Sequence, residues 1–254
     1  MKEHGQRLLP GARTAVTVLV STLVLAAGFL PLSTCRAAGP PDEATQARRR
    51  RALVEKLARE ISDRRVLRAL AGIPRHLFVP AAYLNQAYRD HPLPIGHQQT
   101  ISQPYIVAYM SQALELTGRE KVLEVGTGSG YQAAVLSRLA AQVYSVEILA
   151  ELSTRAARVL AALGIRNVHL KVGDGFDGWP EHAPYDAIIV TAAPRQVPVP
   201  LVEQLKEGGR LVIPLGPSAD QQLKTYRKRG GKLVETDSLP VRFVPMTGKA
   251  RKHQ

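Results

Sequence analysis

The glycine-rich stretch at residues 121–130 constrains the fold of this chain more than any other feature. It reads Lys-Val-Leu-Glu-Val-Gly-Thr-Gly-Ser-Gly, so a short apolar run ends in alternating glycines, and apolar residues at helical spacing follow it. This pattern predicts a strand, a tight turn and a helix. Glycines let such a turn approach a ligand closely, and the free N–H groups at the helix start attract electron-rich groups. The stretch therefore predicts a binding site for a nucleotide-type ligand.

The spacing of the glycines narrows the choice of nucleotide. A dinucleotide fingerprint requires Gly-x-Gly-x-x-Gly, but Tyr131 stands where the third glycine would fall. The pattern resembles instead the first motif of S-adenosylmethionine-dependent methyltransferases, in which an acidic residue beside the glycines, here Glu124, commonly helps to hold the charged methionine end. Glu147 ends a second predicted strand at residues 143–147, about 20 residues further on, where a carboxylate meets a ribose diol. The alternative is a glycine-rich turn that binds no ligand.

The positive charge of the chain is concentrated at its two ends. The formal net charge is +13, but residues 1–51 contain eight Lys or Arg against three acids, and residues 220–254 contain nine against three. The middle of the chain has seventeen basic residues against fifteen acidic ones. No run there mixes basic with aromatic side chains. This distribution favours solvated ends or contact with an anionic surface, and it argues against a nucleic-acid partner.

The first 39 residues form a segment of their own. Three basic residues precede an uncharged stretch, residues 14–35, which is followed by small residues where a peptidase could cut, near Ala37 or Ala38. This arrangement resembles a secretory signal. A membrane anchor, a lipoprotein signal ending at Cys35 and an extension caused by a misplaced start codon are the alternatives. Because Cys35 is the only cysteine, no disulfide forms within the chain.

Two short helices are predicted after this segment. Apolar residues recur at helical spacing in residues 53–61 and again in residues 66–70, with charged residues opposite them. The basic run at residues 48–51 is interpreted as a solvated helix start, with a membrane-surface contact as the alternative. We expect residues 1–39 to be a signal-like or anchor segment and linker, 40–118 the N-terminal helices and substrate loop, and 119–254 the ligand-binding core, with 40–254 forming one compact unit.

A proline-rich stretch at residues 72–104 is the second informative feature. Its prolines, glycines and small polar residues predict mostly irregular structure, and a loop of this length inside a compact domain is usually functional. Gln99, Thr100 and Ser102 supply neutral hydrogen-bonding groups. Pro104 is suited to begin a helix over residues 105–116.

The remainder of the chain alternates between short apolar runs and helical segments. Strands are predicted at residues 168–172, 186–190, 210–215, 222–227 and 241–246, and helices at residues 150–163 and 201–206. Gly230 and Gly231 are expected to join the last two strands in a hairpin. The alternation predicts an α/β fold with a doubly wound, mostly parallel, Rossmann-like sheet, helices on both faces and a small N-terminal helical subdomain. Ligands are then expected beyond the carboxyl ends of the strands.

Two motifs together resemble the protein-L-isoaspartate O-methyltransferase family. The loop reads Ile-Gly-x-x-Gln-Thr-Ile-Ser-Gln-Pro at residues 95–104, and the glycine motif continues as Tyr-Gln-Ala-Ala-Val-Leu. Other methyltransferases share the glycines but not the loop, and the resemblance covers roughly residues 50–248. The chain departs from the family in two places. Gln98 stands where many members have glycine, and residues 14–35 have no counterpart in the ordinary cytosolic enzyme.

The resemblance implies a repair enzyme that uses S-adenosylmethionine to methylate the free carboxylate of L-isoaspartyl residues in damaged proteins, with D-aspartyl residues as a further acceptor. The methyl ester then converts to a succinimide. A methyltransferase for another acceptor and a non-catalytic, membrane-tethered binding module are the alternatives. No metal is expected, because the histidines lack partners at ligand spacing.

The resemblance also implies the site residues. Ser102 is the expected catalytic residue, because its hydroxyl can donate to an acceptor carboxylate that is already ionised at neutral pH and needs no general base. Ile101, Ser102 and Thr247 are expected to bind the substrate. The residues expected to bind the cofactor are Gln99, Thr100, Glu124, Gly126, Thr127, Gly128, Gly130, Glu147, Asp174, Gly175 and Thr191.

The location of the protein rests on two conflicting signals. The N-terminal segment favours export or membrane anchoring through residues 14–35. The cofactor is cytosolic, however, and the basic run at residues 48–51 opposes translocation of the residues after it. We therefore expect a cytoplasmic catalytic domain, with export or membrane anchoring through residues 14–35 as the alternative. We also expect a monomer.

Overall fold

The computed structural model describes residues 42–253, which belong to one compact unit. The predictions for residues 1–39, including the apolar stretch and the cleavage site, lie outside the described residues.

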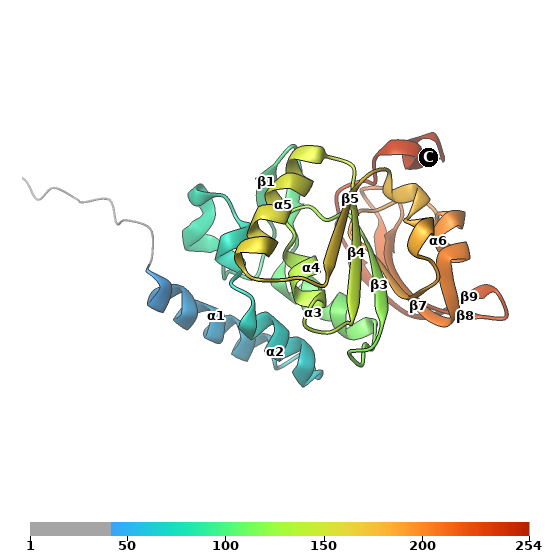
Figure 1. The fold of residues 1–254 in the computed structure, drawn as a ribbon. Coiled ribbons are helices and arrows are strands. Elements are labelled where there is room, and N and C mark those ends of the chain that lie inside the picture. Colours follow the sequence, from blue (N-terminus) through green and yellow to red (C-terminus); the bar gives the residue numbers. More distant parts are fainter. Residues whose placement is uncertain (1–41, 254) are drawn as a thin grey trace, which may run out of the picture. The chain divides into compact units, whose positions relative to one another are not determined.

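A seven-stranded sheet forms the centre of this unit (Figure 1). Its strand order is β5-β4-β3-β6-β7-β8-β9. The first five strands pair in parallel, and β8 and β9 continue the sheet in antiparallel pairing. The strands are β3 (Lys121–Val125), β4 (Gln142–Glu147), β5 (Val168–Val172), β6 (Tyr185–Val190), β7 (Leu205–Leu215), β8 (Gln221–Arg229) and β9 (Lys232–Val241). The prediction of a doubly wound, mostly parallel sheet is confirmed.

Helices cover both faces of the sheet, and each face has its own hydrophobic core (Figure 1). Successive side chains of a strand point to opposite faces, so Ile189 of β6 joins the core on the side of α1 to α5, whereas Ile188 joins the core on the side of α6. Burial of one such side chain contributes about 1.5–3 kcal/mol. The helices are α1 (Glu43–Leu57), α2 (Arg64–Gly72), α3 (Pro104–Ala113), α4 (Tyr131–Leu136), α5 (Ala150–Ala162) and α6 (Val199–Gln204).

The proline-rich stretch contains more regular structure than the sequence predicts. It includes two 3-10 helices, η1 (Arg75–Phe78) and η2 (Ala81–Gln86), and an antiparallel hairpin of β1 (Leu93–Gly96) and β2 (Gln99–Ile101). Leu93, Ile95 and Ile101 are almost fully buried. The hairpin forms because these side chains on one of its faces bury in the main core, which outweighs the local preference of proline and glycine for irregular structure.

The predicted strand at residues 241–246 is wrong. Gly230 and Gly231 both have positive φ, 57° and 74°, so they form a two-residue turn and pairing resumes at once with β9. Beyond β9 the chain leaves the hairpin and passes beside the end of β6, where Ala193 forms a parallel bridge with Pro245. The residues expected as a strand thereby become part of the wall of a pocket.

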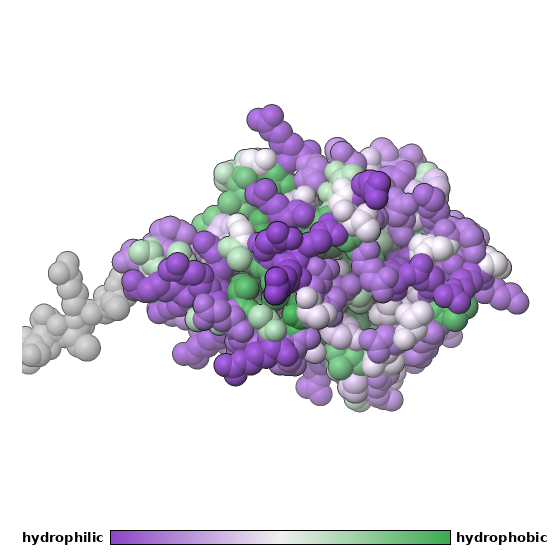
Figure 2. Space-filling model, turned by 90° about the horizontal axis from the view of Figure 1, so that it is seen from below, coloured by the Kyte–Doolittle hydropathy of each residue, from purple (hydrophilic) through white to green (hydrophobic). Residues whose placement is uncertain are grey.

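Hydrophilic residues dominate the surface in the view from below Figure 1, and hydrophobic residues interrupt it in patches (Figure 2). Between residues 42 and 253, no helix combines the length and hydrophobicity that crossing a membrane requires.

Candidate functional site

A pocket opens at the carboxyl ends of β3, β4 and β6, where a doubly wound sheet binds its ligands. One wall is the glycine turn, the second is the β1–β2 hairpin with the residues after it, and the third is the segment that follows β9. The predicted residues that line this pocket are Gln99, Thr100, Ile101, Ser102, Gly126, Thr127, Gly128, Glu147, Gly175, Thr191 and Thr247. Segments far apart in the sequence are thus brought together at one edge of the sheet.

The glycine turn is locked to its neighbouring strands by backbone geometry. Gly126 has a φ of 96° and donates its N–H to the carbonyl of Val146 at 2.8 Å. Its own carbonyl accepts a hydrogen bond from the Thr191 hydroxyl at 2.7 Å. A Cβ at position 126 would lie 2.4 Å from that hydroxyl oxygen, so only glycine fits. The turn therefore presents main chain rather than side chain to a ligand.

Glu147 is the one carboxylate among the described residues that line this pocket. Its Oε2 accepts the N–H of Gly128 at 2.7 Å, and its Oε1 accepts the N–H of Leu149 at 3.0 Å. These bonds orient the carboxylate between β4 and the glycine turn. Each oxygen can accept a second hydrogen bond, so Glu147 retains acceptor capacity for a ligand such as a ribose diol.

Glu124 lies behind the pocket and does not line it. Its side chain is fully buried; Oε2 accepts from the Ser145 hydroxyl, and Oε1 has no partner among the described residues. Ser145 in turn lies 2.6 Å from the hydroxyl of Thr127, which does line the pocket. Burial raises the pKa of Glu124 to about 8; the Ser145 hydrogen bond opposes this rise and the neighbouring Glu147 charge adds to it. Glu124 therefore contacts the pocket only through two hydroxyl groups, not directly as predicted.

Gly130 and Asp174 also lie outside the pocket lining. Gly130 precedes α4 with a φ of 86°, and a Cβ there would lie 3.0 Å from Cβ of Ala156 in α5, so this glycine permits close helix packing. Asp174 accepts from the backbone N–H groups of Phe176 at 3.0 Å and Lys249 at 2.7 Å. The Asp174 carboxylate thereby attaches η5 (Gly248–His253) to the loop after β5, and its contact with adenine stays a prediction.

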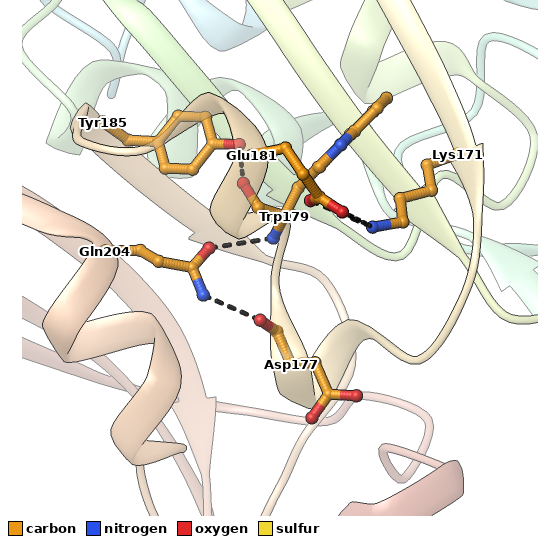
Figure 3. Close-up of polar contacts among 6 residues, drawn as sticks. All are labelled: Lys171, Asp177, Trp179, Glu181, Tyr185 and Gln204. Carbon is orange, nitrogen blue, oxygen red and sulfur yellow. Dashed lines mark hydrogen bonds and ion pairs between the residues drawn. The ribbon is translucent and has the colours of Figure 1, made fainter.

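The loop between β5 and β6 is held in place by Gln204 of α6 (Figure 3). This side chain is 6% exposed; its Oε1 accepts the N–H of Trp179 at 2.8 Å and its Nε2 donates to the carbonyl of Asp177 at 2.7 Å. Tyr185 donates its hydroxyl to the Trp179 carbonyl at 2.6 Å. Because Gly175, at the start of this loop, lines the pocket, Gln204 stabilises one wall of the site from outside. The loop also contains η3 (Gly175–Asp177) and η4 (Pro180–His182).

The β1–β2 hairpin presents the polar residues of the loop motif. His97 and Gln98 occupy its turn with φ values of 52° and 58°, so Gln98 adopts the left-handed conformation for which glycine is suited. A guanidinium nitrogen of Arg155 in α5 donates to the carbonyl of Ile95 at 2.6 Å and ties the hairpin to the main fold. Gln98 therefore occupies the left-handed turn position in place of the glycine that many family members have.

Ser102 lies at the boundary between this pocket and a second one. The second pocket is formed by the end of β9, the residues after it and the start of α3, and it shares Thr100, Ser102, Thr191 and Val244 with the first. The Ser102 hydroxyl makes no hydrogen bond to any other residue in the described range, so it is available to a ligand. Asp90 accepts the N–H of Tyr105 at 2.9 Å, which holds the start of α3 beside this boundary.

Several lining residues are missed by sequence reasoning. They are Val107, Val125, Ser129, Tyr131, Gln132, Val146, Ile148, Leu149, Ala192, Val244, Pro245 and Met246. Those next to the glycine turn and β4 could have been found from their adjacency to the motifs. Residues 244–246 lie next to no motif, and the sequence predicts them to pair within the sheet, so nothing indicates that they line a pocket. No group of metal-binding side chains occurs among residues 42–253.

Comparison with known proteins identifies the family. The family model described as protein-L-isoaspartate(D-aspartate) O-methyltransferase matches residues 48–251. The chain belongs to this family. Members use S-adenosylmethionine, and the glycine turn with the Glu147 carboxylate fits that cofactor. The alternatives of another acceptor and of a non-catalytic binding module receive no support from the comparisons.

Similar proteins span most of this methyltransferase. The protein-L-isoaspartate O-methyltransferase of Gloeobacter violaceus is 55% identical over 190 residues, which cover 74% of this chain and 93% of the relative. That of Synechococcus sp. is 54% identical and covers 82% and 89%, respectively. A solved protein-L-isoaspartate O-methyltransferase has a TM-score of 0.72 and 33% identity, covering 79% of this chain and 67% of the other. A Plasmodium falciparum structure in complex with S-adenosyl-L-homocysteine has a TM-score of 0.67, 25% identity and coverage of 78% and 98%.

Proposed function

We propose that this methyltransferase transfers the methyl group of S-adenosylmethionine to the free carboxylate of L-isoaspartyl residues in damaged proteins, and to D-aspartyl residues as a second acceptor. The observation that carries the proposal is the position of Ser102, which lines both pockets and has a free hydroxyl. Methyl transfer needs such a boundary, because the donor and the acceptor must meet in line at one point.

The charges of the two pockets match the two reactants. The cofactor carries a positively charged sulfonium that supplies the methyl group, and Glu147 is the only charged residue among the described residues that line the first pocket. The acceptor is an anion, and Arg242 is the only charged residue among those that line the second. Opposite charges therefore favour the donor on one side of Ser102 and the acceptor on the other.

The chain's own residues orient the reactants rather than exchange protons. The acceptor carboxylate is ionised at neutral pH, so no general base is required. Ser102 donates one neutral hydrogen bond to it, which orients the carboxylate without the tight ion pair that would stabilise the charge lost in the reaction. Gly126 and Gly128 hold the donor by main-chain contacts, Glu147 accepts from its ribose, and Thr191 supports the glycine turn. The ester product then loses methanol and closes to a succinimide without further help from the enzyme.

The test uses the full chain, radiolabelled S-adenosylmethionine and two peptides that differ only in L-isoaspartate or L-aspartate at one site. Base-labile methyl should appear only on the isoaspartyl peptide. Ser102→Ala should lower the rate about 10- to 100-fold, the cost of a misplaced reactant. Ser218→Ala, at an exposed serine that lines neither pocket, is the matched control and should retain full activity. Equal labelling of both peptides would refute the substrate, and full activity of Ser102→Ala would refute the role of Ser102.

We further propose that the catalytic domain acts in the cytoplasm as a monomer, with any membrane contact made through residues 14–35. The cytoplasmic location is supported by the cofactor, which is a cytosolic metabolite. A phosphatase fused after residue 50 should be inactive in a bacterial host if the domain stays in the cytoplasm. Activity of that fusion in the periplasm would show export instead.

A further inference from the structure

The second pocket carries a single charge, that of Arg242, and the proposed function assigns this charge no direct partner in the bound substrate. Its lining is neutral except for Arg242, and the shared residues at its inner end are Thr100, Ser102, Thr191 and Val244. The full lining is Pro92, Thr100, Ser102, Gln103, Ile106, Thr191, Pro240, Val241, Arg242, Phe243 and Val244. Arg242 belongs to the second pocket alone, so it lies away from the boundary where the methyl group is transferred.

The backbone on the C-terminal side of Arg242 is firmly held. The neighbouring Phe243 donates its N–H to Oε1 of Gln221 at 2.6 Å, and its carbonyl accepts from Nε2 of the same side chain at 3.2 Å. Gln221 is only 3% exposed. One residue further, the carbonyl of Val244 accepts the N–H of Ala193 at 2.9 Å. These bonds fix the chain from which Arg242 projects.

The Arg242 side chain itself is exposed and has no hydrogen bond or ion pair with any residue in the described range. The contrast with Arg227 on β8 is clear, because that guanidinium lies 3.3 Å from the carboxylate of Glu115. A guanidinium offers five donors in a planar fork that suits a carboxylate. An unpartnered guanidinium on a fixed backbone at the edge of a substrate pocket is therefore available to a carboxylate of the substrate.

Arg242 could bind either of two carboxylates of the substrate. One is the acceptor carboxylate, and the other is the side chain of an acidic residue next to the isoaspartyl site. The acceptor must lie at the shared residues around Ser102, and a tight ion pair there would weaken the nucleophile. The flanking residues of the peptide, in contrast, must occupy the rest of the second pocket. We propose that Arg242 selects isoaspartyl sites that have an acidic neighbour in the sequence. This inference rests on the proposed function and deepens it.

The test measures kcat/KM for the full chain on three isoaspartyl peptides whose residues on both sides of the site are Glu, Gln or Lys. At low salt the Glu peptide should be preferred over the Gln peptide by about two- to fivefold, as expected for one partly exposed ion pair. The preference should shrink as salt rises. It should vanish in Arg242→Gln and turn toward the Lys peptide in Arg242→Glu.

Arg229→Gln is the matched control. Arg229 is exposed at the opposite end of the β8–β9 hairpin and should leave the preference unchanged. An equal loss on all three peptides in Arg242→Gln would overturn the proposal, because it would mean that Arg242 binds the acceptor or supports the fold. An unchanged preference in Arg242→Gln would overturn it as well. Failure of the unaltered chain to methylate any isoaspartyl peptide would instead overturn the proposed function, and this proposal with it.

Discussion

Replacement of Glu124 by Gln should remove a large pH dependence from the stability of this methyltransferase. Burial raises the pKa of the folded Glu124 to about 8 from an ordinary value of 4.5. Between these two pH values the unfolded chain ionises at this position while the folded chain holds its proton. The folded state therefore loses stability as pH rises, by about 1.4 kcal/mol for each pH unit. The accumulated loss is about 3 kcal/mol at pH 7 and reaches about 5 kcal/mol above pH 8.

The Gln variant is neutral at every pH, so it should escape this loss. The amide also leaves buried donors unpaired, but that cost does not change with pH and cancels when the two proteins are compared at several pH values. The free energy of unfolding of Glu124→Gln, relative to the unaltered chain, should thus rise by about 3 kcal/mol from pH 4.5 to pH 7. Below pH 4.5 the relative value should be constant.

Denaturant unfolding between pH 5 and 8.5 measures this difference, with the fluorescence of Trp179, the only tryptophan, as the signal. Glu55→Gln, which changes an exposed glutamate of α1, is the control and should follow the unaltered chain at every pH. A difference between Glu124→Gln and the unaltered chain that stays constant within about 0.5 kcal/mol over this range would refute the reasoning. It would mean that Glu124 is ionised in the folded protein.

Two further predictions concern the segments that form the pocket walls. Gln98→Gly should stabilise the protein by about 0.5–1 kcal/mol. Glycine removes the strain of a left-handed backbone at a φ of 58°, and this gain exceeds the entropy that glycine loses on folding. Gly96→Ala, at a φ of 94° in the same hairpin, should act in the opposite direction, and denaturant unfolding of both variants decides; stabilisation by both would contradict the argument. Gln204→Leu should cost about 1–3 kcal/mol, because it leaves the Trp179 N–H and the Asp177 carbonyl unpaired, and should raise KM for the cofactor through the displaced Gly175 wall. Gln196→Leu, at an exposed position, is its control in unfolding and steady-state assays, and equal effects of the two changes would exclude the proposed role of Gln204.

Local patterns in the sequence predict the central sheet well, because each strand next to the glycine turn is decided by nearby residues. β3 and the turn after it follow from the run that ends at Gly126, and the position of Glu147 follows from the length of one strand-helix-strand unit. The hairpin at Gln98 and the path after β9 are different. Both depend on distant partners, since Ile95 and Ile101 bury in the main core and Phe243 is held by Gln221. A local pattern contains no information on such partners.

The difference between local and distant determinants also explains which predicted site residues line the pocket. Gly126 and Gly128 contact the pocket through main chain, so their type alone places them. Glu124 is an acid next to these glycines, yet the alternation of side chains along β3 turns it away from the ligand edge and into the core on the side of α1 to α5. Asp174 follows β5, and the orientation of its carboxylate depends on the backbone N–H of Lys249, which lies 75 residues later in the sequence.

The proposed reaction boundary at Ser102 depends on attachments that lie outside the two pockets. The hairpin is tied to α5 through Arg155 and Ile95, and the segment after β9 is tied to β8 through Gln221. The glycine turn is tied to the end of β6 through Thr191. Each attachment joins a wall of the site to a different part of the rigid sheet or its helices, so the distance between donor and acceptor is set by the whole fold. Because an in-line transfer loses rate steeply when the reactants move apart by about 1 Å, the enzyme needs this rigid scaffold more than it needs an acid or a base.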